Sequence, residues 1–299
     1  MCGIVGYVGR EPRAAYVLID GLRRLEYRGY DSAGVAILEG DVLEVRRAKG
    51  KLVNLEMNLR DRPLEGRLGI GHTRWATHGK PSERNAHPHR AGSIVIVHNG
   101  IIENYRELRA ELEASGAEIQ SDTDTELIAH LIDNLVREDR DLLTAVRDAC
   151  KRLVGSYALA AVCENEPNML VTAKNGGSPI IVGQGDKESF LASDIPAVLP
   201  HTRDIISLYD GDFAVLTEEG IQVVDIEGRP IDREFQVIGW DPVSAEKGGY
   251  DHFMQKEIFE QPRAITDTIG TPVNAAQQDL ALPPPALTPP APPPPPRLI

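Results

Sequence analysis

The chain is poor in cysteine, short of basic residues and free of long hydrophobic runs. Its three cysteines, Cys2, Cys150 and Cys163, form no CxxC pair, which argues against a disulfide scaffold or a thiolate zinc site and favours a reducing cytoplasm. No apolar run approaches the roughly 18 residues that a membrane helix needs. The net charge is −13, so we expect neither nucleic acid nor an anionic membrane as a partner.

The composition is that of an ordinary globular protein, with 41% hydrophobic and 26% charged residues among 299. Residues 3–9 are typical of a buried strand, and 12–28 have the apolar spacing of a helix that ends at Gly29. Further strands are predicted at 35–38, 42–45, 68–71, 93–98, 157–163, 169–173, 180–182, 205–208, 213–216 and 221–224, and helices at 103–115, 125–136 and 142–153. Strands around a central helical block indicate two sheets with helices packed on them, an α+β layered domain.

The last stretch of the sequence is different in kind. Apolar periodicity stops at Thr271, and prolines dominate 283–296. Proline has no N–H and a fixed φ, so we expect 271–299 to be disordered or to form polyproline II helix. A ligand for SH3-type partners is the less favoured interpretation of this tail.

Cys2 follows the initiator Met1 directly. No leader is expected before it, and removal of Met1 would make Cys2 the first residue. Its α-amino group, with an unperturbed pKa near 7.7–8.0, would then serve as the base for its own thiol. The alternative, given equal weight on this stretch alone, is a small hydrophobic residue that opens a buried strand.

Three short segments carry further candidate side chains. Arg74 and Trp75 lie on the Gly-bounded stretch 71–79, where arginine suits a carboxylate, although a surface arginine beside a buried tryptophan fits equally well. Asn99-Gly100 follows an apolar strand and offers two donors for an oxyanion, or forms a simple turn. Residues 121–126 open a helix, so an aspartate or threonine there would cap it, which leaves one carboxylate for a substrate ammonium.

Five of the eight histidines lie between His72 and His98. Imidazole is the commonest metal ligand, which makes a metal site the obvious hypothesis. No HExxH helix or carboxylate–histidine spacing accompanies these residues, so we favour histidines that hydrogen-bond loops, and we expect no metal.

Taken together, these segments resemble the class II glutamine amidotransferases, and within them the glutaminase domains of the glutamine–fructose-6-phosphate aminotransferases (isomerizing), or glucosamine-6-phosphate synthases. The resemblance covers residues 1 to about 270. It rests on the strings CGIVG at 2–6, LRRLEYRGYDSAG at 22–34, GHTRWATHG at 71–79, HNGIIENY at 98–105, SDTDTE at 121–126 and DHFMQKEIFEQP at 251–262.

The resemblance implies a function for each candidate residue. Cys2 would attack the side-chain amide of L-glutamine with its own amine as base, and Asn99 with the N–H of Gly100 would hold the oxyanion. The other residues implied bind the substrate or cover it: Arg74 the α-carboxylate, Asp124 the α-ammonium, Thr77 and His78 the remainder of the pocket, and Trp75 the loop that gates ammonia exit.

The resemblance also implies the fold and the domain limits. The fold would be the four-layer α-β-β-α sandwich of N-terminal-nucleophile hydrolases, with a glutaminase domain at 2–250, the start of a linker at 251–270 and the proline-rich tail at 271–299. No cofactor is expected. The sugar-isomerase half that binds fructose 6-phosphate would be missing, so we expect glutamine hydrolysis without amino-sugar synthesis. The alternatives that stay open are a catalytically silent remnant or interaction module, and the oligomeric state is not fixed.

Overall fold

The structure is a computed structural model that describes residues 2–76, 79–239, 250, 252–270, 273–274 and 279–280. The chain divides into two compact units, Met1–Pro242 and Val243–Ile299. The first unit holds all of the strands and helices discussed below except the last helix and the last strand pair.

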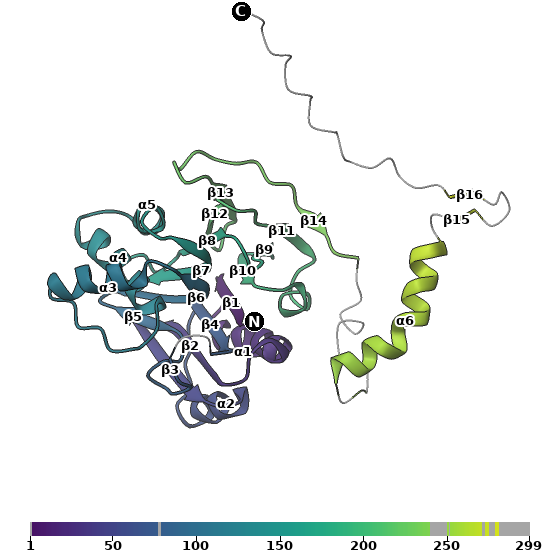
Figure 1. Cartoon of the computed structure of the whole chain (residues 1–299), viewed down its shortest axis with the longest axis horizontal. Coiled ribbons are helices and arrows are strands. Elements are labelled where there is room, and N and C mark those ends of the chain that lie inside the picture. Colours follow the sequence, from purple (N-terminus) through teal and green to yellow (C-terminus); the bar gives the residue numbers. More distant parts are fainter. Residues whose placement is uncertain are drawn as a thin grey trace, which may run out of the picture. The chain divides into compact units, whose positions relative to one another are not determined.

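Two antiparallel sheets form the centre of the first unit (Figure 1). The eight-stranded sheet has the order β14 (Gln236–Val237), β11 (Asp204–Ser207), β9 (Ile181–Gln184), β10 (Glu188–Ala192), β1 (Gly3–Gly9), β4 (Leu68–Arg74), β2 (Ser32–Glu39) and β3 (Val42–Lys49). The six-stranded sheet has the order β13 (Ile221–Val224), β12 (Phe213–Leu216), β8 (Leu170–Asn175), β7 (Gly155–Cys163), β6 (Ile94–Ile102) and β5 (His89–Ala91).

Helices cover the outer face of each sheet. On the eight-stranded sheet lie α1 (Ala14–Leu25), which continues into a 3₁₀ turn at Glu26–Arg28, α2 (Leu52–Asp61) and a 3₁₀ turn at Ile195–Ala197. On the six-stranded sheet lie α3 (Tyr105–Ala114), α4 (Thr125–Arg137) and α5 (Leu142–Cys150), and Figure 1 shows these three gathered on the opposite side of the strands from α1 and α2.

Alternation along the strands explains the layers. On β6, Ile94 and Ile96 pack among the helices α3–α5, whereas Val95 and Val97 pack in the core between the two sheets. Successive side chains of a strand point to opposite faces, so a strand that is apolar at every position needs cover on both sides. Three apolar cores result. The first lies between helices α3–α5 and the six-stranded sheet, the second lies between the two sheets, and the third lies between the eight-stranded sheet and helices α1 and α2. The four-layer α-β-β-α prediction is confirmed.

The structure contains elements that the sequence pattern did not predict. Helix α2 buries only Leu52 and Leu55, so its apolar stripe is too narrow to recognise by spacing. Strand β10 is short and begins with Glu188 and Ser189, and its pairing with β1 and β9 supplies the order that its residue pattern lacks. Strand β6 also runs further than expected, through Ile102.

The second unit is described by itself. Helix α6 (Phe253–Gly270) contains Pro262, and the ring of Tyr250 stacks on Phe259 with centroids 5.7 Å apart. The linker predicted at 251–270 therefore includes a helix. In the predicted tail, 273–274 pairs with 279–280 as β15 and β16, and the proline-rich remainder lies outside the described residues. No helix in the described part of the chain is long and apolar enough to cross a membrane.

Candidate active site

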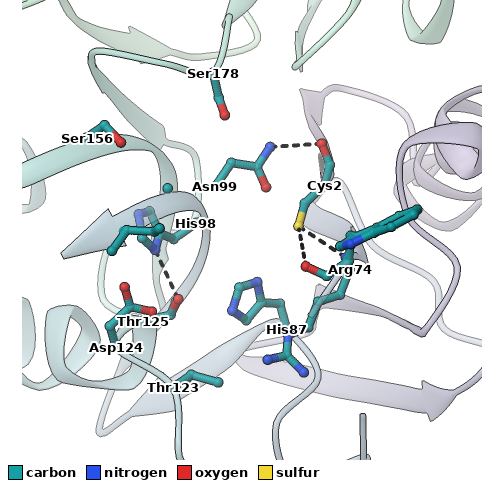
Figure 2. A pocket seen from close by; sticks show the side chains of 13 residues that line it. Cys2, Arg74, His87, His98, Asn99, Thr123, Asp124, Thr125, Ser156 and Ser178 are labelled. Atoms are coloured by element: carbon teal, nitrogen blue, oxygen red, sulfur yellow. Dashed lines mark hydrogen bonds between the residues drawn. The ribbon is translucent and has the colours of Figure 1, made fainter. Parts of the chain in front are cut away.

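Six of the predicted site residues, Cys2, Arg74, Trp75, Asn99, Gly100 and Asp124, line one cavity of about 230 Å³ in the first unit (Figure 2). Cys2 precedes β1, Arg74 ends β4, Asn99 and Gly100 lie within β6, and Asp124 precedes α4. The two sheets and a helix start thus bring together residues that are up to 122 positions apart in the sequence, as counted from Cys2 to Asp124.

The Cys2 thiol faces this cavity. Its Sγ accepts a hydrogen bond from the backbone N–H of Trp75 at 3.2 Å and lies 3.6 Å from the Trp75 carbonyl oxygen. Burial raises the pKa of the thiol, and the Trp75 backbone opposes that effect only in part. Since the neutral thiol is favoured, a nucleophilic thiolate at this position needs a base.

Arg74 and Trp75 have the reverse of the surroundings that the alternative interpretation gave them. Arg74 is buried, with 4% of its surface exposed, and its Nη2 donates to the Gly79 carbonyl at 3.2 Å. Trp75 is 48% exposed, and its ring meets that of Tyr30 edge-on at 5.4 Å. A surface arginine beside a buried tryptophan is therefore wrong, because the arginine is the buried residue and the tryptophan, which also lines the cavity, is about half exposed.

Two residues outside the predicted set hold the backbone that carries Arg74 and Trp75. A Cβ at Gly29 would lie 2.7 Å from the Arg74 carbonyl carbon, so only glycine permits this approach. The Asp31 N–H donates to the Arg74 carbonyl at 3.1 Å, and its carboxylate accepts from the backbone N–H of Ala76. Both belong to the string at 22–34, whose residue pattern predicted no function for Asp31 and only the end of a helix at Gly29.

Asn99 and Gly100 do not form a turn. They pair with Ala158 and Tyr157 in the middle of the β6–β7 ladder. The Asn99 side-chain Nδ2 donates to the Cys2 carbonyl at 3.1 Å, as Figure 2 shows. Gly100 has a φ of +145°, and a Cβ there would lie 2.0 Å from the Ser156 carbonyl oxygen. The turn alternative is wrong because the register of a continuous strand, and not a reversal, places these residues.

Asp124 precedes α4 without capping it. Its Oδ2 accepts from the Ile102 N–H at 2.9 Å, and its side chain makes no capping hydrogen bond to the helix. Glu126 instead reaches back to accept from the N–H groups of Gln120, at 2.8 Å, and Ser121, at 2.5 Å. The expected side-chain cap at Asp124 is therefore absent, Glu126 holds the segment before the helix, and the residue Asp124 lines the cavity.

The comparisons with known proteins agree with this geometry. A family model described as a glutamine amidotransferase domain matches residues 72–200. The glutamine–fructose-6-phosphate aminotransferase (isomerizing) of Clostridium tetani is 54% identical over 271 residues, which is 90% of this chain and 44% of that protein. The protein of the same name from Symbiobacterium thermophilum is 53% identical over 278 residues, 92% of this chain and 45% of that protein. The chain thus spans less than half the length of these relatives.

Solved structures add the fold. The glutamine phosphoribosylpyrophosphate amidotransferase of B. subtilis, complexed with ADP and GMP, superposes with a TM-score of 0.65 at 26% identity, covering 75% of this chain and 49% of that one. A glutamine aminotransferase class-II domain protein from Silicibacter pomeroyi has a TM-score of 0.53 at 17% identity, covering 75% of this chain and 99% of that one, and supports the fold alone. The chain belongs to the class II glutamine amidotransferases.

Three histidines of this amidotransferase domain, His72, His89 and His98, hydrogen-bond buried groups around the cavity. His98 Nδ1 lies 3.1 Å from the Thr125 hydroxyl, and His89 Nε2 lies 3.0 Å from the Thr123 hydroxyl. Burial lowers the pKa of His72 and of His89 to about 3, so both rings are neutral near pH 7. His89 bonds a loop residue as predicted, whereas His98 bonds the first residue of α4 and His72 contacts Asn99 within β6. Within the residues described, no three His, Cys, Asp or Glu side chains are grouped to hold a metal ion.

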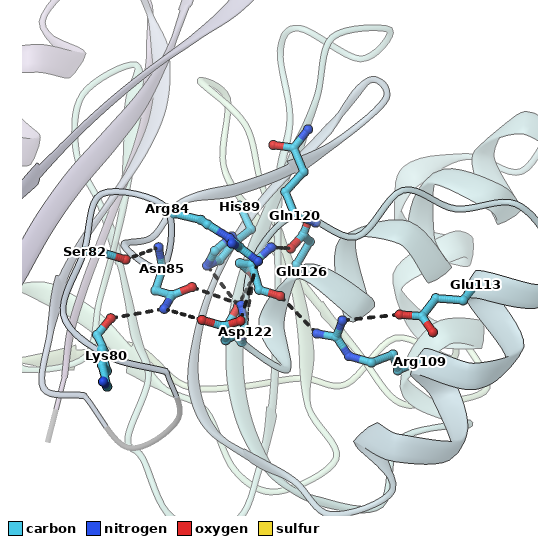
Figure 3. Close-up of polar contacts among 12 residues, drawn as sticks. Lys80, Ser82, Arg84, Asn85, His89, Arg109, Glu113, Gln120, Asp122 and Glu126 are labelled. Carbon is cyan, nitrogen blue, oxygen red and sulfur yellow. Dashed lines mark hydrogen bonds and ion pairs between the residues drawn. The ribbon is translucent and has the colours of Figure 1, made fainter.

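A second polar network connects the loop at 79–90 with the segment that leads into α4 (Figure 3). Asn85 Nδ2 donates to the Lys80 carbonyl and to Asp122 Oδ2, each at 3.1 Å, and Asn85 Oδ1 accepts from the Asp122 N–H at 3.0 Å. Arg109 Nη2 donates to the Ser121 carbonyl at 3.0 Å. The buried Asn85 thereby fixes the start of α4, and no motif in the sequence pointed to it.

The cavity also has lining residues that were not predicted, and two predicted residues are not described by the structure. Thr77 and His78 lie outside the described residues. Seven residues that carried no functional prediction also line the cavity: Ser156, Ser178, His87, His98, Ile101, Thr123 and Thr125. Ser156 lies at the start of β7, and Ser178 lies in the loop after β8. An apolar strand pattern gives no signal for polar residues at such positions.

Proposed function

We propose that this chain hydrolyses L-glutamine to glutamate and ammonia through a glutamyl thioester on Cys2. The observation that supports it most is that a thiol, a buried arginine, an aspartate and the Asn99-Gly100 pair line a single cavity. One cation and one anion suit a zwitterionic amino acid, and the thiol with nearby donors suits acyl transfer.

The first step needs a base for a thiol whose pKa is raised by burial. We assign this base to the α-amino group of Cys2, which exists only after Met1 is removed. The amine takes the thiol proton, directly or through one water, and Sγ attacks the amide carbon of glutamine. The protonated amine then gives its proton to the departing nitrogen, which leaves as ammonia. Water attacks the thioester, releases glutamate and restores the thiol.

The negative oxygen of each tetrahedral intermediate would be held by Asn99 Nδ2–H and the Gly100 N–H. Nδ2 carries two protons, and the Cys2 carbonyl accepts only one of them, which leaves the second for the substrate. Such a pair of donors, fixed before the reaction begins, stabilises charge that develops only at the transition state.

Substrate recognition follows from the two buried charges. Arg74 would pair with the α-carboxylate and Asp124 with the α-ammonium of glutamine, while Thr77 and His78 would complete the pocket. Trp75 would cover the exit for ammonia, in keeping with its exposed ring beside Tyr30 and its backbone contact with the thiol. No cofactor takes part in these steps.

The ammonia would serve the amination of fructose 6-phosphate, because the relatives that carry this domain are named for that reaction. We place the reaction in the cytoplasm, since Cys150 and Cys163 are buried free thiols and the chain has no disulfide-rich pattern.

Glutamate release from L-glutamine tests the proposal. The full chain is purified, its intact mass is measured to establish loss of Met1, and turnover is compared with that of Cys2→Ala. We expect turnover in the trimmed chain and none in the variant. Cys150→Ala and Cys163→Ala are the matched controls, because both thiols are buried outside the cavity and should leave turnover unchanged.

Two results would contradict the proposal. The first is equal glutamate release by Cys2→Ala. The second is the absence of release from a folded chain whose mass shows that Met1 is gone, which would favour a silent interaction module. A chain that retains Met1 should be inactive, and its activation by an aminopeptidase that removes methionine would separate a missing base from a missing function.

A further inference from the structure

His72 is a buried residue behind the cavity that the reaction steps above do not use. It lies on β4 with no exposed surface, and its Nε2 is 2.9 Å from Asn99 Oδ1. Asn99 on the neighbouring sheet makes a second contact, from Nδ2 to the Cys2 carbonyl. The Asn99 amide is therefore held at both ends, by His72 on one side and by the nucleophilic residue on the other.

The partners of Asn99 determine which atoms carry protons. The Cys2 carbonyl can only accept, so the amide atom that faces it is the nitrogen, and the atom that faces His72 is the oxygen. An amide oxygen also only accepts, so His72 Nε2 must carry a hydrogen. His87 Nδ1 lies 3.1 Å from the same Nε2, and with that hydrogen present it acts as a second acceptor.

Burial keeps this histidine neutral. Removal of the ring from solvent lowers the pKa of His72 to about 3, an effect that the bond to Asn99 only partly offsets. A neutral ring has one N–H, and the Asn99 contact places it on Nε2.

We propose that His72 is a positioning residue whose Nε2–H fixes the Asn99 amide with its nitrogen toward Cys2 and toward the oxyanion of the substrate. The inference rests on the proposed glutaminase function. It adds that the donor geometry at Asn99 is set from β4 by a residue that touches neither substrate nor nucleophile.

Loss of the His72 donor would leave Asn99 Oδ1 without its partner and allow the amide to rotate. The substrate oxyanion would then face the amide oxygen for part of the time, which weakens transition-state stabilisation while the Arg74 and Asp124 contacts remain. Removal of an oxyanion donor costs 10²–10³ in kcat, so we expect a loss of roughly tenfold to hundredfold in kcat with the KM for glutamine nearly unchanged.

Two substitutions at this position form a matched pair. His72→Gln places an amide nitrogen near the position of Nε2, whereas His72→Asn places it near Nδ1, too short to reach Asn99. We expect His72→Gln to retain kcat within a few-fold and His72→Asn to lose it. Equal losses in two variants that unfold at the same temperature would overturn the inference, since a merely structural histidine would not distinguish them.

A double-mutant cycle tests whether His72 acts through Asn99. In the Asn99→Ala background, His72→Asn should cause no further loss of kcat, because the amide that it positions is gone. Multiplication of the two single losses in the double variant would show that His72 acts by another route.

The protonation of His72 provides a readout that does not depend on turnover. Nitrogen-15 NMR of the imidazole rings in the full chain should show His72 as the neutral Nε2–H tautomer between pH 5 and 8. A protonated ring or the Nδ1–H tautomer would overturn the inference even in an active enzyme. An inactive wild-type chain with the expected tautomer would contradict the proposed function and leave the His72–Asn99 contact established.

Discussion

The two sheets contribute to the cavity in different ways. The eight-stranded sheet supplies Cys2 and Arg74 at strand ends, whereas the six-stranded sheet supplies Asn99 and Gly100 within a continuous strand. At the strand ends, loop contacts from Gly29 and Asp31 fix the backbone. Within β6, the ladder to β7 fixes the backbone and His72 fixes the side chain.

This difference indicates how each half of the site should respond to mutation. The backbone inside a strand is fixed by hydrogen bonds to both the preceding and following positions of its partner strand. A side-chain substitution there therefore alters the chemistry without moving the surrounding chain. A strand end depends on a few close contacts, so a substitution in the supporting loop shifts Cys2 and Arg74 together.

The largest effect is expected on the six-stranded side. Asn99→Ala removes one oxyanion donor and should lower kcat by 10²–10³, about 2.7–4 kcal/mol, with little change in KM. Steady-state glutaminase kinetics measure both constants. Asn104→Ala, at the partly buried N-cap position of α3 and outside the cavity lining, is the matched control and should change neither. A large rise in KM for Asn99→Ala would instead show that Asn99 contributes to binding of the glutamine ground state, which would contradict a role confined to the transition state.

On the eight-stranded side, Gly29→Ala should be destabilising. The added Cβ would lie 2.7 Å from the Arg74 carbonyl carbon and 3.0 Å from the Trp75 nitrogen, so the backbone that carries the site must move. Overpacking of this kind costs about 1–3 kcal/mol of unfolding free energy.

Urea unfolding measures that loss, and glutamine kinetics should show a raised KM together with a lowered kcat. Gly239→Ala is the control, because no atom lies within 4 Å of its Cβ position. Equal behaviour of the two variants would mean that the loop contact does not position Arg74.

The buried histidines predict a loss of stability in acid. The pKa of His72 and of His89 is about 3 in the folded chain, below the ordinary 6.5, so the unfolded chain binds more protons between these values. The free energy of unfolding is therefore fully present above pH 6.5 and decreases as the pH falls. Each ring should contribute up to about 2 kcal/mol of loss between pH 6.5 and 5.0.

Urea midpoints at several pH values measure this slope. His89→Gln should flatten it, whereas His252→Gln, at an exposed position in the second unit, should leave it unchanged. A slope that His89→Gln does not alter would assign the acid sensitivity to other groups.

Another test concerns the network that joins the loop at 79–90 to the segment before α4. Asn85→Ala removes three hydrogen bonds of a buried side chain and should cost about 0.5–1.5 kcal/mol for each bond that water does not replace. Its neighbour Arg84 pairs with Asp122 at 3.5 Å, with both side chains 61% exposed, so Arg84→Ala should stay within about 0.5 kcal/mol. Thermal unfolding compares the two, and a larger loss for Arg84 would contradict the assignment.

Much of the fold could be predicted from the chain order of apolar residues. Alternation in β6 and the helical spacing in α1 each specify which faces are buried, so the sheets, the covering helices and the layers follow from local pattern. The same pattern missed α2 and β10, because a narrow apolar stripe and a short polar start carry too little signal.

The site, like the fold, could be predicted from the sequence only in part. The sequence motifs and the family resemblance they carry predicted Cys2, Arg74, Asn99, Gly100 and Asp124 as site residues, and the structure brings all five to one cavity. Only the tertiary structure decided that Arg74 is buried and Trp75 exposed, and that Asn99-Gly100 continues a strand. It also decided that His72 and the Cys2 carbonyl, 27 and 97 positions from Asn99, hold one amide between them. Contacts at such separations depend on how two sheets pack, and no local pattern encodes that packing.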